Sequence, residues 1–401
     1  MSNTSSEHPP ELHEPAKIWN KAYISLFFTN MAMNMGMFMN NSLLSLFANY
    51  LGASESQIGL VMGIFAVSSI TFRFVSAPII DTYNRKYIVA FATVMLAVAF
   101  FGFSISVNIT MLIAFRLLQG CGMAFGNACC LAMVSEIIPK DKYASGIGYY
   151  SLAQVVCQAI GPSVGLALVD WVGFPATYLI DACLFLIATF LAVRLKTSFK
   201  RTRKLKLTFN NVIAKEALLP SAVISVLTMG MVSVGSFLIL FAKEQGVTSN
   251  IGWYFTVNAV TILLARPLIG NLVDKFGLIK ITIPALFCNI VSFYIISASS
   301  TLFTFLLAAF ISAFGYGACG PAMQALAMKS VPNERRGAAS STYYIGMDMG
   351  ILIGSTISGG IAEAFGYVAM WHIMPAFFAI SISLIVFFRK TVTRIEADFM
   401  A

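Results

Sequence analysis

The chain has 401 residues, of which 58% are hydrophobic and only 11% charged, and its net charge at pH 7 is +9. Soluble domains carry about 25% charged residues, so this composition excludes a disordered chain, a nucleic-acid-binding domain and a secreted disulfide scaffold. It also argues against a soluble enzyme, and it indicates an all-α protein that crosses a membrane many times.

Twelve apolar segments follow a polar N-terminal tail at residues 1–17. Each segment is long enough for a helix to cross the hydrocarbon core of a bilayer, which takes about 20 residues. The first segment is too long to be the apolar part of a cleavable signal peptide. The predicted spans cover residues 18–49, 57–80, 87–107, 110–135, 145–170, 174–195, 217–242, 250–273, 280–298, 302–328, 338–363 and 367–389.

Positive charge is distributed unevenly among the segments that connect the spans. Of the 26 lysines and arginines, 22 lie in the two tails, in the loops after even-numbered spans or in the span ends that border these segments. Cytoplasmic loops carry such an excess, so we expect a plasma-membrane protein with both termini in the cytoplasm. The densest cluster, at residues 200–206, is expected to orient the chain and to lie against anionic lipid, with a regulatory or nucleic-acid-binding role as the weaker alternative.

Polar residues lie on one face of the first predicted span. Asn30, Asn34 and Asn41 fall within about 40° of one another around a helix. An amide within the bilayer needs a partner, so this face should line a central cavity or form hydrogen bonds between helices. The same lining is predicted to include Asn127, Gln154, Gln158, Asn258, Gln324 and Tyr344.

Charged residues within three spans are candidates for a functional site. Arg116 in the fourth span costs about 2.5–3.5 kcal/mol to insert, so it should face a cavity or a partner, unless backbone carbonyls and lipid headgroups satisfy it. Asp348 in the eleventh span is the most deeply placed carboxylate, and we expect it to bind a proton or a substrate. A structural pair, or a neutral acid that is hydrogen-bonded to a tyrosine, is the alternative. Asp181 in the sixth span is a third candidate, with a structural role as its alternative.

Two related stretches lie at the cytoplasmic ends of the second and the eighth spans. The first runs from Arg73 to Lys86 (RFVSAPIIDTYNRK) and the second from Arg266 to Gly277 (RPLIGNLVDKFG). A carboxylate at the membrane edge is stabilised by a helix N-terminus and by nearby basic groups. These stretches therefore predict a cytoplasmic gate, with plain helix capping as the alternative. The gate is predicted to comprise Arg73, Asp81, Arg85, Glu136, Arg266, Asp274 and Lys275.

The fifth span contains the stretch Cys157–Gly165 (CQAIGPSVG), and we expect Gly161 and Pro162 to form a pivot there. Small residues four positions apart let two helices approach closely, and a proline bends the helix that contains it. Close packing without a moving pivot would explain the glycines equally well.

The two halves of the sequence repeat, since identical residues recur 193 positions apart. The pairs are Ile58 and Ile251, Gly59 and Gly252, Arg73 and Arg266, Asp81 and Asp274, Pro139 and Pro332, and Gly161 and Gly354. Such a duplication predicts two six-helix bundles of the same orientation with a substrate site between them. The predicted units are a tail at 1–17, a bundle at 18–195, a basic linker at 196–216, a bundle at 217–389 and a tail at 390–401.

These motifs resemble those of the major facilitator superfamily. The loop motif of that family is similar to the stretch Gly270–Gly277, whereas the first copy differs from it at Ala77, Thr82 and Asn84. The stretch Arg116-Leu-Leu-Gln-Gly120 resembles the fourth-span motif, and the fifth-span stretch resembles the motif of the exporting, antiporter branch. The resemblance implies that the loop aspartates latch the two bundles, that Arg116 acts in proton transfer or beside the substrate, and that transport is outward.

The sequence and this resemblance predict a secondary transporter that exports a small amphipathic or hydrophobic compound in exchange for protons. An uptake symporter, or an exporter of sugars or metabolites on the same fold, is the alternative. The sequence has no phosphate-binding loop, nucleophile elbow or metal-ligand cluster, so we expect no enzyme activity, metal or cofactor, and a proton gradient as the energy source. The expected partners are a small-molecule substrate, protons and the lipid bilayer, without nucleic acid, and the protein is expected to be a monomer.

Overall fold

The computed structural model describes residues 19–138, 143–195, 213–247, 249–332 and 336–400, which form helices without any strand among them. The predicted N-terminal tail and most of the predicted linker lie outside these residues. The helices are α1 (Lys21–Tyr50), α2 (Glu55–Thr82), α3 (Arg85–Ser104), α4 (Ile109–Ile137), α5 (Tyr143–Val193), the short 3-10 helix η3 (Lys215–Ala217), α6 (Leu218–Glu244), α7 (Trp253–Phe276), α8 (Leu278–Ser297), α9 (Leu302–Lys329), α10 (Arg336–Ile373), α11 (Pro375–Phe387) and α12 (Arg389–Met400).

Two of these helices contain more than one predicted span. Helix α5 is interrupted at Gly173 and α10 at Gly366, where the backbone φ angles are 79° and 82°. Glycine adopts this left-handed conformation without the steric cost that other residues pay, so the chain can reverse there. The two glycines lie 193 residues apart, as the repeat requires. Counted on both sides of these breaks, the helices account for the predicted all-α, twelve-span architecture.

Eight helices in the described part of the chain are long and apolar enough to cross a membrane, and the count rises to nine if the bent pair formed by α11 and α12 is included. Two of the eight are the interrupted helices, with 41 and 36 qualifying residues. Helix α1 is not among them because its asparagines lower its mean hydropathy, although its 30 residues would suffice in length.

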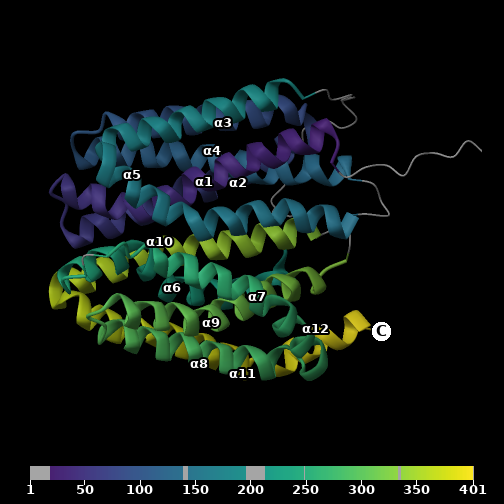
Figure 1. Ribbon diagram of the computed structural model, residues 1–401. Coiled ribbons are helices and arrows are strands. Elements are labelled where there is room, and N and C mark those ends of the chain that lie inside the picture. Colours follow the sequence, from purple (N-terminus) through teal and green to yellow (C-terminus); the bar gives the residue numbers. More distant parts are fainter. Residues whose placement is uncertain (1–18, 139–142, 196–212, 248, 333–335, 401) are drawn as a thin grey trace, which may run out of the picture.

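The helices form two halves that lie side by side, with α1 to α5 in one and α6 to α12 in the other (Figure 1). The halves meet where α2 packs on α10, α5 on α7 and α1 on α6. We call the end of the molecule that carries α12 and the first residues of α1 the terminal face, and the opposite end the distal face. The boundaries of the predicted units stay a prediction.

Side-chain caps fix where several helices begin at the distal face. The Ser54 hydroxyl accepts a hydrogen bond from the Gln57 amide, and the Gln57 side chain accepts one from the Ser54 amide in return. Asn108 and Thr301 cap α4 and α9 in the same way with single bonds. Each such cap stabilises a helix by about 1 kcal/mol, so the short distal turns have defined ends.

The packing inside each half repeats as closely as the sequence does. The rings of Phe100 and Phe185 lie 4.8 Å apart in the first half, and those of Phe293 and Phe378 lie 5.0 Å apart in the second. These pairs are again separated by 193 residues. Gly36 faces the Phe185 ring, just as Gly230 faces the ring of Phe378.

Candidate functional site

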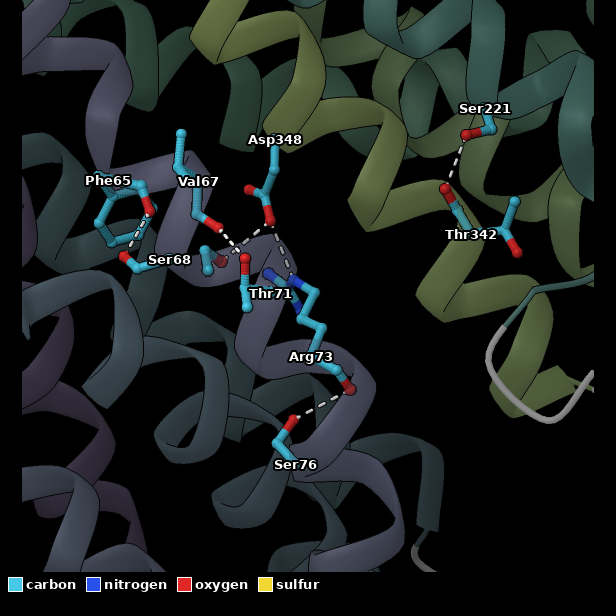
Figure 2. Close-up of polar contacts among 10 residues, drawn as sticks. Phe65, Val67, Ser68, Thr71, Arg73, Ser76, Ser221, Thr342 and Asp348 are labelled. Carbon is cyan, nitrogen blue, oxygen red and sulfur yellow. Dashed lines mark hydrogen bonds and ion pairs between the residues drawn. The ribbon is translucent and has the colours of Figure 1, made fainter. Parts of the chain in front are cut away.

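An ion pair joins the two halves through α2 and α10. The Nε of Arg73 donates to the Oδ2 of Asp348 at 2.9 Å (Figure 2). The Ser69 hydroxyl donates to the same oxygen at 3.0 Å. The Asp348 side chain is 3% exposed and that of Arg73 22% exposed. Because one partner comes from each half, any movement that separates α2 from α10 at this level must break the pair.

Aromatic and amide groups extend this pair within the second half. The guanidinium of Arg73 lies over the Tyr344 ring, 5.2 Å from its centre. The Nε2 of Gln324 donates to the Tyr344 hydroxyl at 3.3 Å. Sequence reasoning placed Arg73 in a gate, Asp348 in a coupling site and the other two in a cavity lining, and the structure brings all four together. Sequence reasoning did not identify Ser69, because this residue belongs to no recognisable motif.

Arg116 lies buried in the first half, with neutral partners. Its Nη1 donates to the Oε1 of Gln119 at 2.6 Å, and its Nη2 donates to the Met62 carbonyl at 3.3 Å. The guanidinium also lies over the Phe65 ring, 4.9 Å from its centre. Within the described residues it contacts no carboxylate, so the structure separates it from the Asp348 pair.

Asp181 is fully buried in the second helix of α5. Neither of its carboxyl oxygens has a hydrogen-bond partner among the described residues, and the Tyr178 hydroxyl one turn earlier has none either. Both the coupling role and the structural role expected for this acid stay predictions.

Two of the three α1 asparagines are buried inside the first half. The Nδ2 of Asn30 donates to the Tyr150 carbonyl of α5 at 3.3 Å, and the Nδ2 of Asn34 donates to the side-chain oxygen of Asn30 at 2.9 Å. Asn41 is half-buried. For Asn30 the structure thus shows the helix–helix hydrogen bond that was the alternative to a cavity-lining role.

The other predicted lining residues are scattered in the structure. Asn258 donates to the Ala309 carbonyl at 3.0 Å, within the second half. Gln158 is half-buried and Gln154 is exposed. The side chain of Asn127 lies outside the described part of the chain. The cavity itself stays a prediction.

Most of the predicted gate at the terminal face lies outside the described side chains. This applies to Asp81, Glu136, Arg266 and Asp274. The Nε of Arg85 donates to the Ile80 carbonyl at 3.2 Å, which fixes the turn between α2 and α3. Lys275 is exposed and lies over the Phe276 ring. The proposed latch by the loop aspartates therefore stays a prediction.

Small residues bring the two halves into backbone contact near the distal face. A side chain at Gly59 of α2 would collide with the Ser355 carbonyl of α10, and one at Gly252 with the Ser163 backbone of α5. The Thr256 hydroxyl of α7 donates to the Ala159 carbonyl. The repeat pair Gly59 and Gly252 thus marks two equivalent places where the halves touch.

The predicted pivot in α5 faces two different neighbours. Gly161 packs against Phe38 and Gly165 against Met39 and Leu43, all in α1. Pro162 is buried beside them. Ser163 faces the other way, toward α7, so this stretch connects α1 with the interface between the halves.

Hydrogen bonds across the halves close the distal end of the α2–α10 contact. Glu363 accepts from the Ser54 hydroxyl at 3.0 Å and from the Ser56 amide at 2.9 Å, so it caps α2 from the opposite half. The Tyr367 hydroxyl donates to the Glu55 carboxylate at 3.1 Å. Sequence reasoning did not single out these hydrogen bonds across the halves, because their residues are typical of any loop at the membrane edge.

We expect Glu363→Gln to loosen the first turn of α2. An amide accepts hydrogen bonds less strongly than a carboxylate and lacks the charge that the helix N-terminus favours. Hydrogen–deuterium exchange of peptides that cover Ser54–Leu60 should become several-fold faster. The matched control is Glu244→Gln, at the exposed distal end of α6. Equal exchange in both variants would show that Glu363 does not hold the halves together.

The chain is similar in sequence to known transporters. A family model described as Major Facilitator Superfamily matches residues 26–249 and again 218–398. The chain is 24% identical to an uncharacterized MFS-type transporter, MJ1560, of Methanocaldococcus jannaschii, over 91% of this chain and 97% of that protein. It is 24% identical to the multi-drug resistance efflux pump PmrA of Streptococcus pneumoniae, over 82% of this chain and 86% of PmrA. Identity to the multidrug resistance protein MdtG of Salmonella arizonae is 25%, with 84% and 89% covered.

Solved structures share the fold at lower sequence identity. A POT family transporter in complex with a thioalcohol-conjugated peptide superposes with a TM-score of 0.80 at 13% identity, over 94% of this chain and 99% of that chain. A mutant of the nucleoside transporter NupG gives a TM-score of 0.75 at 13% identity, over 92% and 100%. At such identities the likeness concerns the fold alone.

Proposed function

Because the chain belongs to the major facilitator superfamily, we propose that it exports a small amphipathic or hydrophobic compound in exchange for protons. The members it matches are multi-pass membrane transporters rather than enzymes, and PmrA and MdtG are described as multidrug efflux or resistance proteins. The proposal takes the proton gradient as the energy source, without a cofactor. It also takes the protein as a monomer in the plasma membrane with both termini in the cytoplasm.

The observation that carries this proposal is the buried pair of Arg73 and Asp348 between the halves. A charged pair in a low-dielectric interior is strongly favourable only while both partners are ionised. A proton on Asp348 removes the attraction and frees Arg73. Proton binding and separation of the halves are then the same event, which is what coupling requires.

The direction of substrate transport can be inferred from the face at which the two halves are in contact. By the distribution of positive charge the distal face is the external one. The glycine contacts and the Glu363 bonds lie near that face, so we infer that this arrangement is closed toward the exterior. Asp348 would lose its proton on the cytoplasmic side and pair with Arg73, and a substrate from the cytoplasm would bind between the halves in this state.

Transport by inside-out vesicles tests the function. With an acidic lumen, which corresponds to the exterior, we expect ethidium or Hoechst 33342 to accumulate in vesicles that contain the protein. A protonophore should abolish the accumulation, and vesicles without the protein provide the control. Loss of a preloaded probe under the same gradient would instead identify a symporter. Movement that ignores the gradient would contradict proton coupling.

A further inference from the structure

Asp181 and Asp348, the two acids within the spans, differ in whether their carboxyl groups have hydrogen-bond partners. Asp348 accepts bonds from a guanidinium and a hydroxyl, whereas both oxygens of Asp181 lie fully buried without a partner among the described residues. An isolated carboxylate in a protein interior is very costly, and the group takes up a proton instead. In one and the same conformation, Asp181 is therefore expected to be protonated and Asp348 ionised.

Packing alone does not require an acid at this position. The repeat places Met374 where the first half has Asp181, and Trp371 where it has Tyr178, each 193 residues further on. Met374 and Trp371 are as fully buried as their counterparts. The surrounding aromatic rings also correspond, since Phe100 and Phe185 repeat as a pair in the second half. The second half thus fills the same place with an apolar side chain.

A buried positive charge accompanies this acid. Arg116 lies seven residues after Ile109, the first residue of α4, and Asp181 eight residues after the Gly173 break. At the helical rise both lie about 10–12 Å from the distal face. Tyr178 lies one turn before Asp181 on the same helix, within range of both charges. The corresponding stretch of α9, Leu302–Gly315, contains no charged residue, so the second half lacks both charges.

Few other titratable groups lie on α1 and α3 at the depth of Asp181. Helices α1 and α3, which pack on α5, contribute the rings of Phe47, Phe100 and Phe103 around Tyr178. The last ten residues of α1 contain one titratable group, Tyr50, which is exposed at the helix end, and the second half of α3 contains none. Burial without a partner then decides the charge of Asp181. The Nε of Arg116 has no partner among the described residues, so it retains donor capacity for a new anion.

We propose that Asp181 is a second proton-binding group of the transport cycle, loaded from the distal face, with Arg116 as the charge that balances it once the proton leaves. In each cycle the carboxyl group takes one proton from external water and passes it on to the cytoplasmic side, which leaves a carboxylate whose charge Arg116 balances. The proposal rests on the proton-driven function proposed above. It assigns the two acids complementary states, because one holds a proton while the other is paired.

The test uses Asp181→Met, which introduces the residue of the second half. The variant should fold with an equal or higher melting temperature, because it removes a polar group that has no partner. Infrared spectra of the purified full chain should lose the carbonyl band of a buried protonated carboxyl group. Proton-driven transport in proteoliposomes should lose one proton per cycle. The matched control is Asp170→Asn, an exposed acid of α5 just before the Gly173 break.

The infrared band also separates this proposal from the function on which it rests. A wild-type chain that transports no probe but shows the band would refute proton-driven export and retain Asp181 as a proton site. A spectrum without the band, or one in which Asp181→Asn retains it, would overturn the assignment. Unchanged proton stoichiometry in Asp181→Met would also overturn it. If the Met variant fails to insert, Asp181→Asn and the wild-type spectrum still decide.

Discussion

Vesicles that contain the Asp348→Asn variant will not accumulate substrate in response to a proton gradient. Asparagine keeps the size of the side chain but cannot exchange a proton or attract Arg73, so both parts of the proposed coupling are lost. Removing one partner of a buried ion pair typically costs about 3–5 kcal/mol, and the partial exposure of Arg73 places this case near the lower end. A loss of roughly 3 kcal/mol shifts the equilibrium away from this conformation by about 100-fold.

Substrate counterflow distinguishes loss of coupling from loss of the whole site. Exchange of labelled for unlabelled probe needs no net proton movement, so Asp348→Asn should retain it. Ser69→Ala removes only one hydrogen bond to the same oxygen, worth about 1 kcal/mol, and should leave transport within a few-fold of wild type. Asp170→Asn should have no effect. Accumulation by Asp348→Asn at the wild-type rate would rule out this acid as the coupling group.

The architecture was largely predictable from the sequence because membrane solvation imposes strong and regular constraints. Span length and the distribution of positive charge follow from local composition, and the 193-residue repeat follows from comparing the two halves of the sequence. The interruptions at Gly173 and Gly366 lie where the predicted spans end, since a reversal between two packed helices needs a residue that tolerates positive φ. Two predicted spans in the described residues fall short of the length and hydropathy of a typical span: α1, whose polar face lowers its mean hydropathy, and α7, whose apolar stretch Trp253–Ala265 is short.

The site was predictable as a set of residue types but not as a set of partners. Asp348 was singled out because an acid inside a span is costly, and Arg73 because it belongs to a repeated motif. Their pairing depends on how α2 crosses α10, and a single sequence does not contain that crossing angle. For the same reason Asn30 could not be assigned in advance either to a cavity or to its bond with Tyr150. Ser69 and Glu363 act only through their position opposite the other half.

Gly59→Ala is expected to block closure of the distal face and so to stop the transport cycle. The added carbon would meet the Ser355 carbonyl oxygen and the Gly359 backbone, and backbone atoms cannot move aside as a flexible side chain can. The two halves would have to separate there, so the equilibrium shifts toward the state that is open at this face. Because a tenfold shift takes only about 1.4 kcal/mol, we expect transport to fall by at least about tenfold while the chain still folds and inserts.

Two glycines in similar helical settings provide the controls for this substitution. A carbon added at Gly235 of α6 meets nothing within 4 Å, and one at Gly360 of α10 meets only the Ser56 hydroxyl at 4.0 Å. Their alanine variants should transport like wild type, even though Gly360 lies next to the same contact. Gly252→Ala should reproduce the Gly59 defect, because the repeat places it at the equivalent contact with Ser163. A membrane-impermeant maleimide that reacts with Ser56→Cys should label the Gly59→Ala background faster than the wild-type background. Equal labelling together with normal transport in Gly59→Ala would mean that the halves need not touch here for the protein to work.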